Sequence, residues 1–178
     1  SKLSERNALW AARRGLYTTV AGNRPTGTNA LLENVVVPVD VLGATCRDLT
    51  ALFDAHGYQD SVIFGHAKDG NIHFMLNEQF RDAKQLVRYR NFTEEMVQLI
   101  LEADGSLKAE HGTGRIMAPF VRRQFGDELF DVMREIKRLI DPKGFLNPGV
   151  VLAEEDTDYA ADLKVAETVE EEVDRCVE

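Results

Sequence analysis

The sequence contains no run of about 18 apolar residues, which a membrane-spanning helix would need. Its first ten residues, SKLSERNALW, lack the apolar centre of a signal peptide. They also lack an initiator methionine, so the chain could be a piece of a longer protein. Cysteine occurs only at Cys46 and Cys176, which excludes a disulfide framework. We therefore expect a cytoplasmic protein in a reducing compartment, and 178 residues suffice for one domain with its own core.

A basic surface is also lacking, because the net charge is −9. Residues 154–178 hold eleven acids against two bases, Lys164 and Arg175, whereas residues 1–153 hold nineteen of each. A neutral body without a basic stripe argues against nucleic acid as a partner. We expect residues 1–153 to form the domain, and 154–178 to be an acidic linker that is mobile or ordered only against another domain.

The hydrophobic pattern predicts a mixture of helices and strands in residues 33–110. In this order, βαββαβ, the elements are typical of an α+β, ferredoxin-like fold, with one antiparallel sheet and helices on one face. We also expect one helix before this unit and two after it. The predicted helices are 3–17, 41–56, 81–103, 118–125 and 127–140, and the predicted strands are 33–38, the two arms of 61–77, and 106–110.

Residues 61–77, SVIFGHAKDGNIHFMLN, have the pattern of a β-hairpin. If Asp69 and Gly70 form a two-residue type I′ turn, His66 lies directly opposite His73. Opposed Cβ atoms lie about 4.5–5.5 Å apart, so both imidazoles could bind one metal ion. A stacked pair of histidines without a metal is the alternative, and the spacing alone does not decide between them.

Two other segments contain residues suited to binding. The strip 111–115, HGTGR, has two glycines and could pass close to a ligand or to another strand. Arg13 and Arg14 follow one another in the first helix, where a solvated face is the ordinary interpretation. Alternatively, one of the two guanidinium groups pairs with a carboxylate in a fork of two hydrogen bonds.

Four segments in order carry a family resemblance. Residues 64–74, FGHAKDGNIHF, resemble the G-H-x-x-D-G-N-x-H signature of the C-terminal domain of FAD-linked oxidases. Residues 107–114, 136–149 and 10–15 are similar to three further motifs of that family. The family includes flavin-dependent D-lactate, glycolate and D-2-hydroxyglutarate dehydrogenases. The resemblance thus implies oxidation of a D-2-hydroxy acid to a 2-oxo acid, with transfer of a hydride to the flavin.

The resemblance also implies roles for single residues. It places a divalent metal, zinc or manganese, on His66, His73 and Glu110. It makes His111 the base for the substrate hydroxyl and Arg13 the partner of the substrate carboxylate. The remaining expected contacts are Asn71 and Lys108 with the substrate and Asn147 with the flavin.

The same resemblance places the cofactors outside this chain. FAD is expected on a preceding domain, and Val173–Glu178 resembles the approach to an iron–sulfur module with a 4Fe–4S cluster. Electrons would pass to that fused domain and then to a quinone at the membrane periphery. Met75 stands where hydroxyglutarate-type members have Asn, which argues against a dicarboxylate substrate. The alternative is a non-catalytic α+β module that binds a metal or a small acid.

Overall fold

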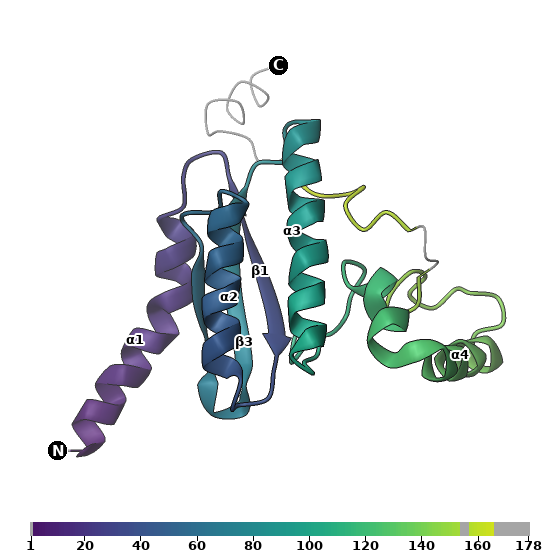
Figure 1. Cartoon of the computed structure of the whole chain (residues 1–178), viewed down its shortest axis with the longest axis horizontal. Coiled ribbons are helices and arrows are strands. Elements are labelled where there is room, and N and C mark those ends of the chain that lie inside the picture. Colours follow the sequence, from purple (N-terminus) through teal and green to yellow (C-terminus); the bar gives the residue numbers. More distant parts are fainter. Residues whose placement is uncertain (1, 154–156, 166–178) are drawn as a thin grey trace.

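The computed structural model describes residues 2–153 and 157–165. It contains a three-stranded antiparallel sheet with the strand order β1-β3-β2, together with helices, which confirms the α+β class (Figure 1). The helices are α1 (Lys2–Gly22), α2 (Leu42–Ala55), α3 (Ala83–Glu102) and α4 (Val121–Ile140), with short 3-10 helices η1 (Ala67–Asp69) and η2 (Ala118–Phe120). The strands are β1 (Asn29–Val36), β2 (Val62–His66) and β3 (Asn71–Glu78).

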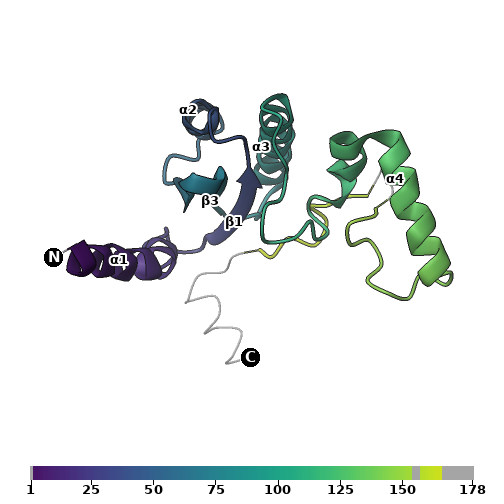
Figure 2. The same ribbon diagram turned by 90° about the horizontal axis from the view of Figure 1, so that it is seen from below.

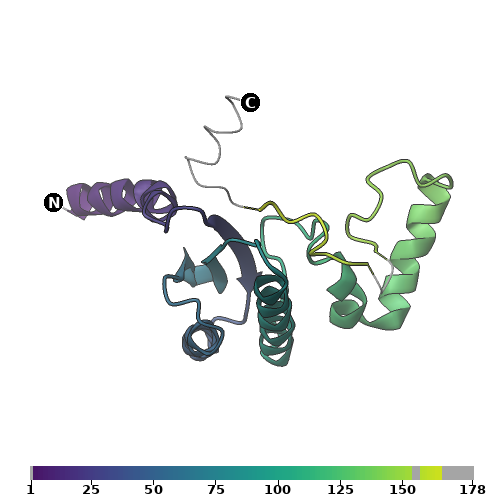
Figure 3. The same ribbon diagram turned by 90° about the horizontal axis from the view of Figure 1, so that it is seen from above.

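Helices α2 and α3 cover the same face of the sheet, as the ferredoxin-like arrangement predicts (Figures 2 and 3). Three aromatic rings join these layers, one each from α2, β3 and α3. The ring centroids of Phe53, Phe74 and Phe92 lie 5.7–6.1 Å apart, which is a favourable distance for tilted aromatic contacts. The helical spacing of buried residues on α2 and α3 therefore places the core where the sequence predicts it.

The fourth strand, expected at residues 106–110, is not formed. Ser106 makes an isolated antiparallel bridge with Val36, after which the chain leaves the sheet. Side chains take the place of a strand partner, since the amide of Leu107 donates to the side chain of Gln124. The amide of Glu110 likewise donates to the side chain of Asn34. Because side chains accept hydrogen bonds from these backbone amides, the segment does not need the hydrogen bonds of a strand, and it follows the edge of β1 without regular pairing.

The two ends of the domain expose apolar residues. Helix α1 has no buried residue, and Trp10 on it is 55% exposed. Helix α4 exposes Ile136 and Leu139. The two helices expected at 118–125 and 127–140 correspond to η2 followed by α4, and α4 is interrupted at Gly126, where the backbone is not helical (φ 77°). In the described part of the chain, no helix is both long enough and apolar enough to cross a bilayer.

Residues 157–165 pack against this domain, although their composition predicts a segment that is mobile or ordered only against another domain. The ring of Tyr159 contacts those of Tyr89 and Phe120, with centroids 6.4 and 5.4 Å away. Ala160 is only 3% exposed, and Asp158 forms an ion pair with Arg90 at 2.6 Å. The acidic composition predicted a solvated linker, but its few apolar residues face α3 and η2. Cys176 and the iron–sulfur-like end, residues 173–178, lie outside the described residues.

Candidate metal and substrate site

The hairpin differs in register from the expected one. Phe64 pairs with His73 and His66 pairs with Asn71, so the loop has four residues, including η1. A type I′ turn needs positive φ at both central residues, and in this loop only Gly70 has it (φ 67°). The register is shifted by two positions, which preserves the face of every side chain. His66 and His73 are therefore diagonal neighbours on one face, with ring centroids 5.6 Å apart.

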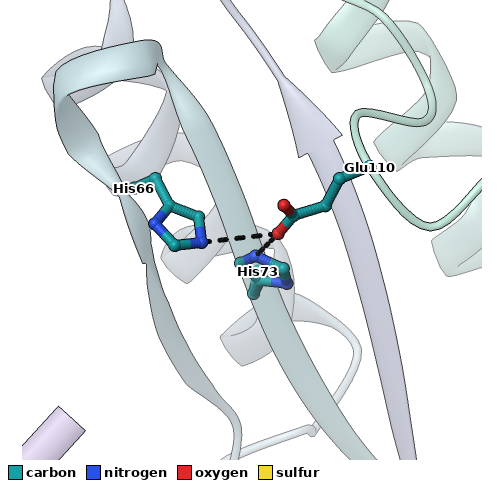
Figure 4. Close-up of side chains that lie close together, drawn as sticks. All are labelled: His66, His73 and Glu110. Carbon is teal, nitrogen blue, oxygen red and sulfur yellow. Dashed lines mark ion pairs between the residues drawn. The ribbon is translucent and has the colours of Figure 1, made fainter.

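Glu110 completes a cluster with the two histidines. Its Oε1 lies 2.7 Å from Nε2 of His73 and 3.4 Å from Nε2 of His66 (Figure 4). The three potential ligand atoms all lie within 4.8 Å of one another. Residues of β2, of β3 and of the irregular segment after Ser106 thus converge on one point of the sheet face opposite α2 and α3. The structure brings together all three residues that the resemblance assigns to a metal.

The donor set fits a divalent cation. Two imidazole nitrogens and one carboxylate oxygen are ligands that zinc and manganese both accept. His73 is buried, and its Nδ1 and Nε2 make no hydrogen bond within the described part of the chain. The 2.7 Å approach of Nε2 to Oε1 of Glu110 is therefore a close contact without the alignment of a hydrogen bond. A buried lone pair without a donor, aimed at a carboxylate, is a reason to expect a cation between them.

The protonation states agree with metal ligation. Burial lowers the pKa of His73, and His111 and His66 lower it further, although Glu110 opposes them. Burial alone would raise the pKa of Glu110, but a hydrogen bond from Asn71 and the two histidines bring it below its ordinary value. A neutral imidazole and an ionised carboxylate are the forms that bind a metal.

Two further expected residues lie beside the cluster. The ring centroid of His111 is 4.9 Å from that of His73. Arg13 reaches the cluster from α1, because its Nη2 lies 3.2 Å from Nε2 of His66. Nε2 of His66 is also the atom that faces Glu110. Arg13 would therefore have to move away from Nε2 before His66 could bind a metal. The guanidinium of Arg13 and the imidazole of His111 therefore both border the cluster.

Lys108 and Asn147 lie elsewhere. The Lys108 ammonium pairs with the buried Glu33, which neighbours Asn34 on β1. Because successive side chains of a strand point to opposite faces, Glu33 lies on the helix-covered face, away from His73. Asn147 lines a hollow of about 760 Å³ beside α4, and no residue of the cluster lines that hollow. The structure thus does not bring either residue to the cluster.

Sequence reasoning missed Asn34. This residue is fully buried on β1, directly opposite His73, and its side chain contacts Asn71, Glu110 and His111. A carboxamide at the head of a Val-Val-Val run was the signal that could have revealed it. A polar side chain in a strand buried on both faces needs partners, and those partners carry the site.

Comparison with known proteins identifies the family of this chain. Residues 1–151 match the family model described as FAD linked oxidases, C-terminal domain. The chain belongs to this family. It is similar to "Glycolate oxidase subunit GlcD" of Bacillus subtilis (strain 168), at 30% identity over 149 residues, which are 83% of this chain and 31% of that protein.

The names of other relatives refer to different acids. "Probable D-lactate dehydrogenase, mitochondrial" of Danio rerio is 30% identical over 147 residues, 83% of this chain and 29% of that protein. "D-2-hydroxyglutarate dehydrogenase" of Xanthomonas citri pv. viticola is 32% identical over 146 residues, 79% of this chain and 29% of that protein. The chain spans less than a third of the length of these relatives.

Proposed function

We propose that this chain is the substrate-binding part of an FAD-dependent D-2-hydroxyacid dehydrogenase. The protein would oxidise a D-lactate-like acid to the 2-oxo acid and deliver the hydride to FAD held outside this chain. The observation that carries the proposal is the convergence of His66, His73 and Glu110, with Arg13 and His111 at its border. Family membership supports the flavin, and the geometry of the cluster supports the place of the substrate.

The residues of the cluster would hold zinc or manganese. When bound, such an ion would supply Lewis-acid polarisation of the substrate hydroxyl. The nitrogens of His66 and His73 and the carboxylate of Glu110 leave further coordination positions open to the substrate. The described ligand atoms need little movement for this, since they already lie within 4.8 Å of one another.

The side chains around the cluster would bind and deprotonate the substrate. Arg13 would hold the carboxylate with two parallel hydrogen bonds, because a planar guanidinium matches a planar carboxylate. This would free Nε2 of His66, which Arg13 contacts in the structure. His111 would accept the hydroxyl proton as a general base, since its ring lies beside that of His73. Loss of this proton accompanies the departure of the hydride from the carbinol carbon to the flavin.

Apolar neighbours of the cluster favour a monocarboxylate. The ring of Phe64 stacks on His73, with centroids 5.4 Å apart and planes 7° from parallel. In the next row of the sheet, Leu32, Met75 and Val62 stand side by side on the same face. None of these side chains can pair with a second carboxylate, and an unpaired buried charge is costly. We therefore propose an acid with a small apolar side chain rather than hydroxyglutarate.

The electron path extends this proposal beyond the described residues. We propose that reduced FAD passes its electrons to a fused domain with a 4Fe–4S cluster and then to a quinone at the membrane periphery, with the protein in the cytoplasm. Support for the cluster comes from the sequence of residues 173–178 alone. Cys176 would be one of several thiolates, because a cluster needs a set of them.

A substrate screen on the full-length protein tests the proposal. Bleaching of the oxidised flavin absorbance would be followed with D-lactate, L-lactate, glycolate and D-2-hydroxyglutarate. We expect D-lactate to reduce the flavin fastest and its L-enantiomer to be inert, because Arg13 and His111 fix the face of the carbinol carbon. The isolated 178-residue chain should be colourless and inactive. If no 2-hydroxy acid reduces the flavin, the chain is instead a non-catalytic binding module.

A further inference from the structure

The side chain of Asn34 connects strand β3, which carries His73, with the irregular segment that carries Glu110. It is 0% exposed and projects from β1 on the same face as His73, its direct partner across the sheet. Its Nδ2 donates to Oδ1 of Asn71 and to the carbonyl of Ile72, at 3.2 Å in the second case. Its Oδ1 accepts from the amides of Glu110 at 2.7 Å and of His111 at 3.3 Å.

The segment that carries Glu110 needs such an anchor. Residues 108–112 have no regular secondary structure, and the side chain of Glu110 is about half exposed. No ladder therefore holds the carboxylate against the two histidines. Lys108, paired with Glu33, holds the segment from the other face of β1. On the face of the cluster, the carboxamide of Asn34 binds the backbone of both Glu110 and His111.

We propose that Asn34 is the positioning residue of this site, which sets Glu110 against the two histidines and His111 beside them. The inference rests on the proposed function, since it concerns how the metal and substrate residues are aligned. Asn34 also orients Asn71, which in turn hydrogen bonds to Glu110. Outer groups of this kind determine how well the ligands of a metal are aligned, and their loss typically lowers metal affinity about 10- to 100-fold.

The acceptor oxygen is the essential atom of Asn34. The backbone amides of Glu110 and His111 both donate to this oxygen, and a backbone N–H group can only donate a hydrogen bond, never accept one. The Nδ2 of Asn34, by contrast, donates to two acceptors, Oδ1 of Asn71 and the carbonyl of Ile72. Aspartate at position 34 would keep both amide bonds but lose the donor bonds and add a buried charge, while leucine, of similar size, would lose all of these hydrogen bonds.

The experiment compares Asn34→Leu, Asn34→Asp and a control in the full-length protein. Asn77→Leu is the matched control, because Asn77 lies on β3 on the same face and binds the carbonyl of Asp60, outside the cluster. Affinity for Mn²⁺ and Zn²⁺ is measured by titration calorimetry on metal-free protein, together with amide hydrogen exchange and the melting temperature. Turnover of D-lactate is then followed with saturating metal, to separate kcat from KM.

We expect Asn34→Leu to lose about 10- to 100-fold in metal affinity and to exchange faster at the Glu110 and His111 amides. Asn34→Asp should keep the slow exchange of these two amides, because it retains their acceptor. With saturating metal, kcat of Asn34→Leu should stay reduced, because His111 is misplaced as well. Asn77→Leu should change the melting temperature alone.

The outcomes separate this inference from the proposed function. Unchanged metal affinity and unchanged amide exchange in Asn34→Leu would overturn the role of Asn34. The same holds if the Glu110 and His111 amides exchange as fast in Asn34→Asp as in Asn34→Leu, because aspartate retains their acceptor. If the wild type binds no metal while Asn34→Leu still frees the two amides, the positioning role stands and the proposed metal site fails.

Discussion

Arg13 and His66 touch although 53 positions separate them, with Nη2 of the arginine 3.2 Å from Nε2 of the histidine. Helix α1 buries none of its residues, so it adds little to the core of this domain. It nevertheless delivers a cation to the border of the His66–His73–Glu110 cluster. Its contribution is therefore to the site rather than to the stability of the described fold.

The first prediction concerns which arginine binds the substrate carboxylate. In the full-length protein, Arg13→Met should raise KM for D-lactate by about 10- to 100-fold, because hydrogen bonds to a charged group are lost. Arg14→Met serves as the control, since it changes the neighbouring residue of the same helix, and KM should stay within about threefold. Steady-state kinetics measure both. A larger effect at Arg14 would assign the carboxylate to that residue instead.

The second prediction concerns the metal ligands. His73→Phe should bind Mn²⁺ and Zn²⁺ more than about 100-fold more weakly, since a first ligand is lost and not merely an outer partner. Phenylalanine retains the stacking surface against Phe64, which limits the change to the nitrogens. His56→Gln is the control, because His56 pairs with Glu95 and is no member of the cluster. Equal metal affinity in all three proteins, measured by calorimetry, would rule out this site.

The third prediction concerns the close approach of the two hairpin strands. A Cβ atom at Gly65 would lie 2.2 Å from the carbonyl oxygen of Asn71, which is backbone and cannot move aside. Gly65→Ala should lower the free energy of unfolding by roughly 1–3 kcal/mol, as overpacking does, and weaken metal binding as well. At Gly15, on α1, a Cβ atom meets nothing within 4 Å. Gly15→Ala should be neutral or slightly stabilising in urea denaturation.

The fourth prediction concerns the segment 157–165. The hydrogen bond from Arg90 holds the pKa of Asp158 below its ordinary value, and the amide of Ala160 adds to this. Because the pKa of Asp158 is lowered in the packed segment, the ionised carboxylate stabilises that packing when the pH is above the ordinary carboxyl pKa of about 3.9. That stabilisation is lost as the pH falls through the lowered pKa. The segment should therefore stay packed at neutral pH and loosen only in acid.

The amide resonance of Ala160 reports this titration directly, because that amide donates to Oδ1 of Asp158. Its midpoint in an NMR pH series should lie below about 3.9 in the wild type. In Arg90→Met the midpoint should move upward, whereas Arg88→Met, which removes the cation paired with Glu78, should leave it in place. A midpoint unaffected by Arg90→Met would mean that the ion pair does not anchor the segment.

The hairpin shows how far a sequence pattern reaches. Alternation of apolar residues and the Asp-Gly pair placed the two strands and put both histidines on one face. The pattern did not reveal the register, since the predicted and the observed pairing differ by two positions and bury the same side chains. The geometry of the loop decided between them, and it depends on the contact of Gly70 with Val37 on another part of the chain.

The position of Lys108, which was expected to contact the substrate but lies away from the cluster, also has a physical reason. Lys108 lies only two positions before Glu110, yet it pairs with Glu33 on the opposite face of β1. A buried carboxylate needs a cation, and Lys108 is the one that reaches Glu33 in this fold. No local pattern in the sequence reveals that demand, because Glu33 and Lys108 are 75 positions apart.

Local periodicity in the sequence was enough to place the helices, the two arms of the hairpin and both histidines on one face, since each of these depends on residues only a few positions apart. The strand expected at 106–110 became an irregular segment because Gln124 and Asn34 satisfy its amides. The meeting of Glu110 with the histidines, and of Arg13 with His66, likewise depends on how distant segments pack. Such contacts join groups more than 35 positions apart, and packing and hydrogen-bond satisfaction in the folded chain decide them.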